Sequence, residues 1–165
     1  MGRFTQSITD SDTAFDVLEE IKRIVNLESF DITDDGLQPE EAEHAKIKLN
    51  QLNPDMLSKI YNTYDDEGVI VYASILLHVG ADINEEMKNK IIFSIDRNLN
   101  DYKVYLKEYR KEDPENILKE REMALIPLRQ SILDYDGHTR HVIRSPNSFG
   151  KKEEVEKEIS VYPMF

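Results

Sequence analysis

The 165-residue chain contains no cysteine, and its six glycines form no phosphate-binding pattern. A chain without cysteine has no disulfide framework, no thiolate zinc site and no cysteine nucleophile, and it fits a reducing compartment. Neither G-x-G nor G-K-[ST] occurs, which argues against the standard nucleotide-binding loops. We therefore assign no cofactor and no metal, and we expect the protein in the cytoplasm.

Long apolar runs are also missing. The longest candidate, "VIVYASILLHVG" (69–80), is shorter than the roughly 18 residues that a membrane span needs. The opening stretch "MGRFTQSITDSD" lacks the basic start and the apolar core of a secretory signal. We expect no membrane among the partners.

Positive charge is scarce, because 21 lysines and arginines stand against 33 aspartates and glutamates, a net charge of −12. Such a surface repels DNA and RNA over most of its area, so we expect a basic protein partner and no nucleic acid. The stretch "YDGHTRHVIRSPNSFGKK" (135–152) is the exception. Between 137 and 152 it carries +4 and no acid, which leaves −16 on the rest of the chain.

Hydrophobic spacing predicts a mainly α-helical single domain over 1–165. Ser11 and Asp12 suit a helix start, Pro39 suits a first helical position, and Gly80 suits a helix end. Pro127 is expected to kink the last helix or to end it early. The expected helices are 12–26, with Phe15, Leu18, Ile21 and Val25 on its buried face; 39–51; one starting at 54–55 and closed by "YDDEG" (64–68); 69–79; one from 84 that keeps helical spacing through 101–111; and one from 113–114 onward.

From Asp134 onward the helical spacing disappears, and Asp136-Gly137 gives a turn signal. We therefore expect a helical bundle or a short stack of helical hairpins over about 12–134. An irregular or short β-containing segment is expected over about 135–165, with the strand near 139–143.

The strongest suggestion of catalysis is His138-x-x-His141, with Arg140 and two aspartates close by. Two imidazoles beside carboxylates can hold a metal or transfer protons, so a small hydrolase or a metal-dependent enzyme using His138 and His141 is one alternative. The turn-forming neighbours favour an exposed loop instead. We assign no catalytic residue and treat His138, Arg140 and His141 as secondary partner contacts.

Acidic residues cluster in predicted loops and at helix starts, with tyrosines near them. Carboxylates in such places pair with Arg and Lys of a basic partner, and an exposed tyrosine supplies apolar contact area with a polar tip. The predicted partner-binding residues are Asp34, Asp35, Glu40, Glu41, Asp65, Asp66, Glu67 and Tyr64.

The first half of the chain resembles an uncharacterised family of small bacterial domains that open Met-Gly-x-aromatic and continue to Asp-x-Ala-x-Asp-x-Leu. Phe4 matches the aromatic position, although the family usually has Trp there. The chain also departs from the pattern at Thr5 and Ser7, where Gly is frequent. The resemblance implies a mainly helical fold and transfers no catalytic residue. The matching positions are Met1, Gly2, Phe4, Ile8, Asp12, Ala14, Asp16 and Leu18.

In general character the chain is similar to the immunity proteins of bacterial toxin–immunity pairs, including contact-dependent inhibition systems. Those proteins are often small, acidic, cysteine-poor and cytoplasmic. The similarity implies a non-enzymatic protein that neutralises a basic, nuclease-type toxin by covering its active site. A helical adaptor or a phage-encoded inhibitor remains a further alternative, because it differs only in its partner.

Overall fold

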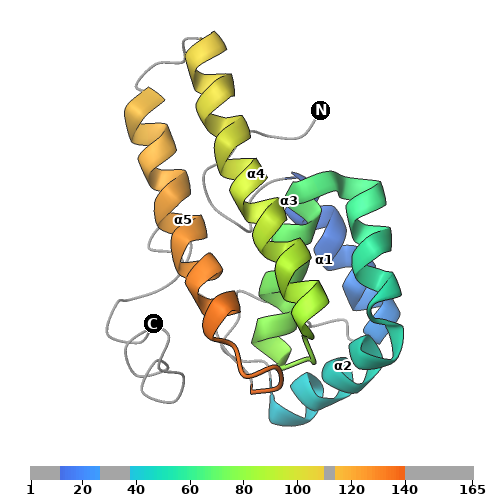
Figure 1. Ribbon diagram of the computed structural model, residues 1–165. Helices are drawn as coiled ribbons and strands as arrows, with labels where there is room; N and C mark the ends of the chain where they lie inside the picture. The colour runs from blue at the N-terminus through green and yellow to red at the C-terminus, as the bar shows by residue number, and fades with distance from the viewer. Residues whose placement is uncertain (1–11, 27–37, 110–113, 140–165) are drawn as a thin grey trace.

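The computed structural model describes residues 12–26, 38–109 and 114–139, and these form a bundle of helices (Figure 1). No strand occurs in these ranges, so the prediction of a mainly α-helical bundle is confirmed. The β-containing segment predicted near 139–143 lies almost entirely outside the described residues. The helices are α1 (Asp12–Val25), α2 (Pro39–Leu52), α3 (Asp55–Val79), α4 (Glu85–Tyr109) and α5 (Pro114–Asp134).

The first two helices pack on one another and on α3. The inner face of α1 is formed by Ala14, Val17, Ile21 and Val25, all fully buried. The predicted face included Phe15, which is wrong, since 61% of that side chain is exposed. Nε2 of His44 in α2 donates to the carbonyl oxygen of Val25 over 2.8 Å, which supplies one of the end carbonyls of α1 with a donor.

Helix α3 is the centre of the bundle, because it contacts each of the other four helices. Its backbone leaves the helical region at Asp65 (φ 58°, ψ −152°). Figure 1 shows that α3 changes direction along its length. The turn predicted over 64–68 is therefore reduced to a break at one residue. After the break, every residue from Gly68 to Gly80 is buried, as the long apolar run 69–79 requires.

Helix α3 ends as predicted at Gly80, whose φ of 76° suits glycine. A short loop follows, and Oδ1 of Asn84 accepts a hydrogen bond of 2.8 Å from the amide of Met87 at the start of α4. Helix α4 then runs unbroken to Tyr109, as the helical spacing through 101–111 predicted.

Helix α5 packs along α4 and continues through Pro127. Of the two outcomes predicted for this proline, the early end of the helix is wrong, and the kink stays a prediction. Leu125, Leu128 and Ile132 are fully buried on the inner face. Burial on both sides of the proline stabilises the helix more than one lost backbone hydrogen bond destabilises it. Helix α5 ends at Asp134, where the helical spacing of the sequence also stops.

Candidate functional site

Three consecutive acids, Asp65 to Glu67, lie at the break in α3, and the break turns them in different directions. Asp65 is exposed, whereas Asp66 is 8% exposed. Arg97 of α4 binds the Asp66 carboxylate with two parallel bonds, from Nε to Oδ2 and from Nη2 to Oδ1, both 2.7 Å long. This two-point pairing fixes the guanidinium plane and raises the pKa of Arg97.

Glu67 reaches into the interior between α3 and α5. Its Oε2 lies 2.7 Å from Nη2 of Arg121, the largest fully buried side chain of the described part of the chain. Oδ1 of Asn98 accepts two further bonds from this guanidinium, and the ring of Tyr102 lies 4.9 Å from its central carbon. Burial raises the pKa of Tyr102 to about 12 although Arg121 opposes the shift. A buried arginine with these partners is a structural connection between α3, α4 and α5.

All three acids at 65–67 were predicted to bind a partner, and of these three Asp65 alone is exposed. Asp66 and Glu67 bind arginines of the same chain, and their use by a partner stays a prediction that would require those ion pairs to open. Sequence reasoning missed Arg97 and Arg121 because they stand 31 and 54 residues along the chain from their carboxylates.

Tyr64, the predicted aromatic contact, is half-buried beside the acidic face of α1. Burial raises the pKa of its hydroxyl, and the charges of Glu20 and Asp16 raise it further. The same Glu20 lies 3.8 Å from Nζ of Lys59 and from a guanidinium nitrogen of Arg23. We call Tyr64, Asp16, Glu20 and Asp65 the Tyr64 patch.

The other predicted acids lie at the start of α2 or before it. Glu40 is exposed in the first turn. Oε1 of Glu41 accepts a bond of 3.0 Å from the amide of Gln38, so this carboxylate caps the helix. Asp34 and Asp35 lie outside the described residues.

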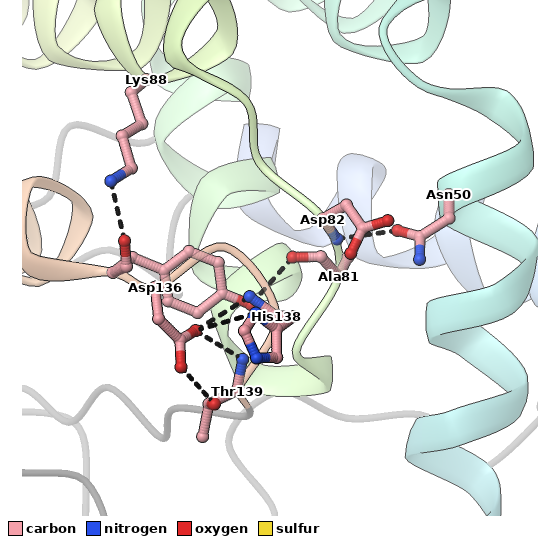
Figure 2. A network of polar contacts seen from close by, with 8 residues as sticks. Asn50, Ala81, Asp82, Lys88, Asp136, His138 and Thr139 are labelled. Atoms are coloured by element: carbon pink, nitrogen blue, oxygen red, sulfur yellow. Dashed lines mark hydrogen bonds and ion pairs between the residues drawn. The ribbon is translucent and has the colours of Figure 1, made fainter.

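His138 lies in an exposed loop that follows α5 (Figure 2). Oδ1 of Asp136 accepts bonds from the amides of His138 (2.9 Å) and Thr139 (2.7 Å), and Oδ2 accepts one from the Thr139 hydroxyl. Partial burial raises the pKa of Asp136, but these bonds outweigh it and lower the pKa to about 2. The turn predicted at Asp136-Gly137 is thus confirmed as a loop closed by an aspartate side chain.

The same loop is fastened to the connection between α3 and α4. The hydroxyl of Tyr135 donates to the carbonyl oxygen of Ala81 (2.8 Å), and Nζ of Lys88 donates to the carbonyl oxygen of Tyr135 (2.7 Å). Asn50 of α2 accepts a bond from the amide of Asp82 in that connection (2.8 Å). These contacts hold the start of the loop against the connection between α3 and α4, and His138 itself is exposed.

The proposed catalytic pair is not assembled by the described residues. Nδ1 of His138 lies 3.7 Å from Asp136, while Arg140 and His141 lie outside the described ranges. In residues 12–26, 38–109 and 114–139, no group of three or more His, Asp or Glu side chains is placed to hold a metal ion.

A groove with a volume of about 560 Å³ is lined by residues of α3 and α4. Sequence reasoning missed it, although its residues recur at helical spacing: Leu57 and Tyr61 lie one turn apart on α3, and Phe93 and Arg97 one turn apart on α4. Nη2 of Arg97 donates to the hydroxyl of Tyr61 over 2.7 Å. We call this feature the α3–α4 groove. Its lining consists of Leu57, Ser58, Tyr61, Asn62, Val69, Asn89, Lys90, Phe93, Ser94 and Arg97.

Comparisons of the chain with protein-family models, with curated proteins and with solved structures find no significant match. Among the helices described above, none combines the length and the apolar character that crossing a membrane would take.

Proposed function

We propose that the protein is a non-catalytic binding module, an immunity protein that neutralises a basic, nuclease-type toxin by covering its active site. The observation that carries this proposal is the Tyr64 patch. A half-buried tyrosine there borders the exposed carboxylate of Asp16, and the exposed Asp65 follows it directly in the chain. Glu20, also beside the tyrosine, is 15% exposed and already lies near Lys59 and Arg23. Aromatic rings supply contact area at interfaces, and carboxylates around them select Arg and Lys on the partner.

The overall charge supports the same partner. A nuclease presents basic groups where nucleic acid binds, and a chain with a net charge of −12 is attracted to such a surface from a distance. Docking of the Tyr64 patch over the basic groove would exclude the nucleic acid. Inhibition of this kind requires no catalytic group.

The genetic test uses the open reading frame directly upstream of the gene for this chain. Expression of that frame alone is expected to stop growth of a bacterial host, and co-expression of the full 165-residue chain is expected to restore it. The two purified proteins should form a complex whose association rate falls steeply as salt rises. A neighbour that is not toxic, or a toxic neighbour that the chain neither binds nor neutralises, would contradict the proposal.

A pair of matched variants tests the surface. Asp16→Lys combined with Asp65→Asn changes the charge of the Tyr64 patch by the same amount as Glu108→Gln combined with Glu115→Lys changes it at the far ends of α4 and α5 (Figure 1). The first variant is expected to lower the association rate by about tenfold or more. The second is expected to leave it almost unchanged. If both variants lowered the association rate equally, the net charge of the protein and not the Tyr64 patch would determine that rate.

A further inference from the structure

The α3–α4 groove differs in charge from most of this acidic protein. Its two charged lining residues, Lys90 and Arg97, are both cationic, and no lining residue is an acid. Lys90 is about half exposed and lies 3.4 Å from Glu86 one turn earlier. Exposed helical pairs of this kind exchange readily with other ions, so the Lys90 ammonium is available to an incoming anion.

Arg97 is held in place, but its guanidinium has hydrogen-bond donors left over. Asp66 takes Nε and Nη2, and Tyr61 takes Nη2 as well. Within the described part of the chain, Nη1 has no acceptor, so its two hydrogens remain for a ligand. Because Asp66 fixes the guanidinium plane, these donors have a defined direction before any ligand arrives.

The apolar part of the groove is formed largely by aromatic rings and buried aliphatic groups. Phe93 is 61% exposed, although it lies on the groove side of α4, and its ring centre lies 4.9 Å from the guanidinium carbon of Arg97. The ring of Tyr61 lies 5.4 Å from the same carbon. Leu57 and Val69 are each 2% exposed. Large apolar rings exposed beside fixed donors are typical of ligand sites.

We propose that the α3–α4 groove is a binding site for a small aromatic carboxylate. The ligand's ring packs against Phe93, Leu57 and Val69, and its carboxylate accepts hydrogen bonds from Nη1 of Arg97 and Nζ of Lys90. The volume of about 560 Å³ lies within the usual range for small-molecule sites. This inference does not depend on the proposed toxin binding, because the two surfaces share no residue.

Binding is tested with the full chain and two probes that differ in charge, indole-3-acetate and tryptamine. The protein has no tryptophan, so indole emission excited beyond the tyrosine absorption reports the ligand alone. Indole-3-acetate is expected to bind saturably at one site, confirmed by calorimetry with naphthalene-1-acetate. Tryptamine is expected to bind at least about tenfold more weakly, because its ammonium meets two cations.

Matched variants locate the site. Lys90→Glu and Phe93→Ala each alter an exposed side chain of the groove, and each is expected to weaken indole-3-acetate binding by about tenfold or more. Lys103→Glu and Phe15→Ala make the same changes at exposed positions outside the groove, and they should leave binding unchanged. Arg97→Lys keeps a cation beside Asp66 but removes Nη1, so it too should weaken binding while the helical circular dichroism stays the same.

Three results would overturn the proposal. One is the absence of saturable binding of both aromatic acids at millimolar concentration. Another is equal affinity for indole-3-acetate and tryptamine, which would show that the cations play no part. The last is an equal loss of indole-3-acetate affinity on Phe15→Ala and Phe93→Ala. That result would indicate a general attraction of aromatic acids to exposed rings.

Discussion

Gly68 and Tyr64 approach so closely that a Cβ atom placed on Gly68 would lie 2.3 Å from the Cβ of Tyr64. Residues four apart on a regular helix keep their Cβ atoms about 5–6 Å from each other. The break at Asp65, between the two residues, brings them together. Gly68 is thus the residue that permits the change of direction in α3.

Substitution Gly68→Ala is expected to lower the free energy of unfolding by about 2 kcal/mol, because the added methyl group overlaps the Tyr64 side chain. Helix propensity by itself would act in the opposite direction and raise it by about 1 kcal/mol. Urea denaturation followed by circular dichroism measures the change, with Asn62→Ala at an exposed position of the same helix as control. A more stable Gly68→Ala protein would show that α3 is regular in solution.

Asp65 has a positive φ of 58° with ψ of −152°, a backbone region used almost exclusively by glycine. We expect Asp65→Gly to raise the free energy of unfolding by about 1 kcal/mol through relief of this strain. Asp65→Ala removes the same charge but keeps a Cβ atom, so it should not stabilise. Identical effects of the two substitutions on the melting temperature would assign the gain to charge and not to the backbone.

The ion pair between Glu67 and Arg121 is unequal in its exposure. Glu67→Met leaves a fully buried guanidinium without this carboxylate and should cost about 3–5 kcal/mol. Arg121→Met should cost less, because 21% of the Glu67 side chain reaches solvent. The double variant is expected to be more stable than the sum of both losses indicates. A double-mutant cycle by urea denaturation measures this, and strictly additive losses would mean that the pair contributes no coupling.

The loop after α5 should make stability depend on acid pH. The pKa of Asp136 is about 2 in the folded protein, below the ordinary 3.8, so the folded state favours the ionised carboxylate. Its contribution is therefore nearly complete above about pH 4 and is lost as pH falls through about 2. Asp136→Asn is expected to be less stable than the parent at neutral pH, and the difference should shrink as pH falls toward 2 and vanish below it.

Melting temperatures of the parent and Asp136→Asn across that acid range provide the measurement. Asp101→Asn, on the exposed side of α4, corrects for the general loss of one negative charge. Thr139→Val removes a donor to the same carboxylate and should give a smaller effect in the same direction. A constant difference between parent and Asp136→Asn at every pH would contradict the assignment.

The order of the helices could be predicted from the sequence because the residues that start and end a helix act locally. Pro39, Gly80 and Asn84 mark ends that the structure places within a residue or two of expectation. The early end predicted at Pro127 did not occur, because the inner face of the helix is buried on both sides of the proline.

The candidate site was harder to predict from the sequence, because its contacts join distant parts of the chain. The acids at 65–67 look alike in the sequence, yet Asp66 and Glu67 acquire buried partners from α4 and α5 while Asp65 stays exposed. Nothing close to them in the sequence identifies Arg97 or Arg121 as those partners. The α3–α4 groove was hidden for the same reason, since each helix contributes only half of its lining.

The central position of α3 has a consequence for how the molecule opens. Among the described helices, the backbones of the pair α1–α2 do not come close to those of the pair α4–α5, whereas both pairs pack on α3. Each pair can therefore detach while the other stays folded, and amide hydrogen exchange should resolve two separate opening reactions. Amides of residues 69–79, which both pairs cover, should exchange most slowly of all.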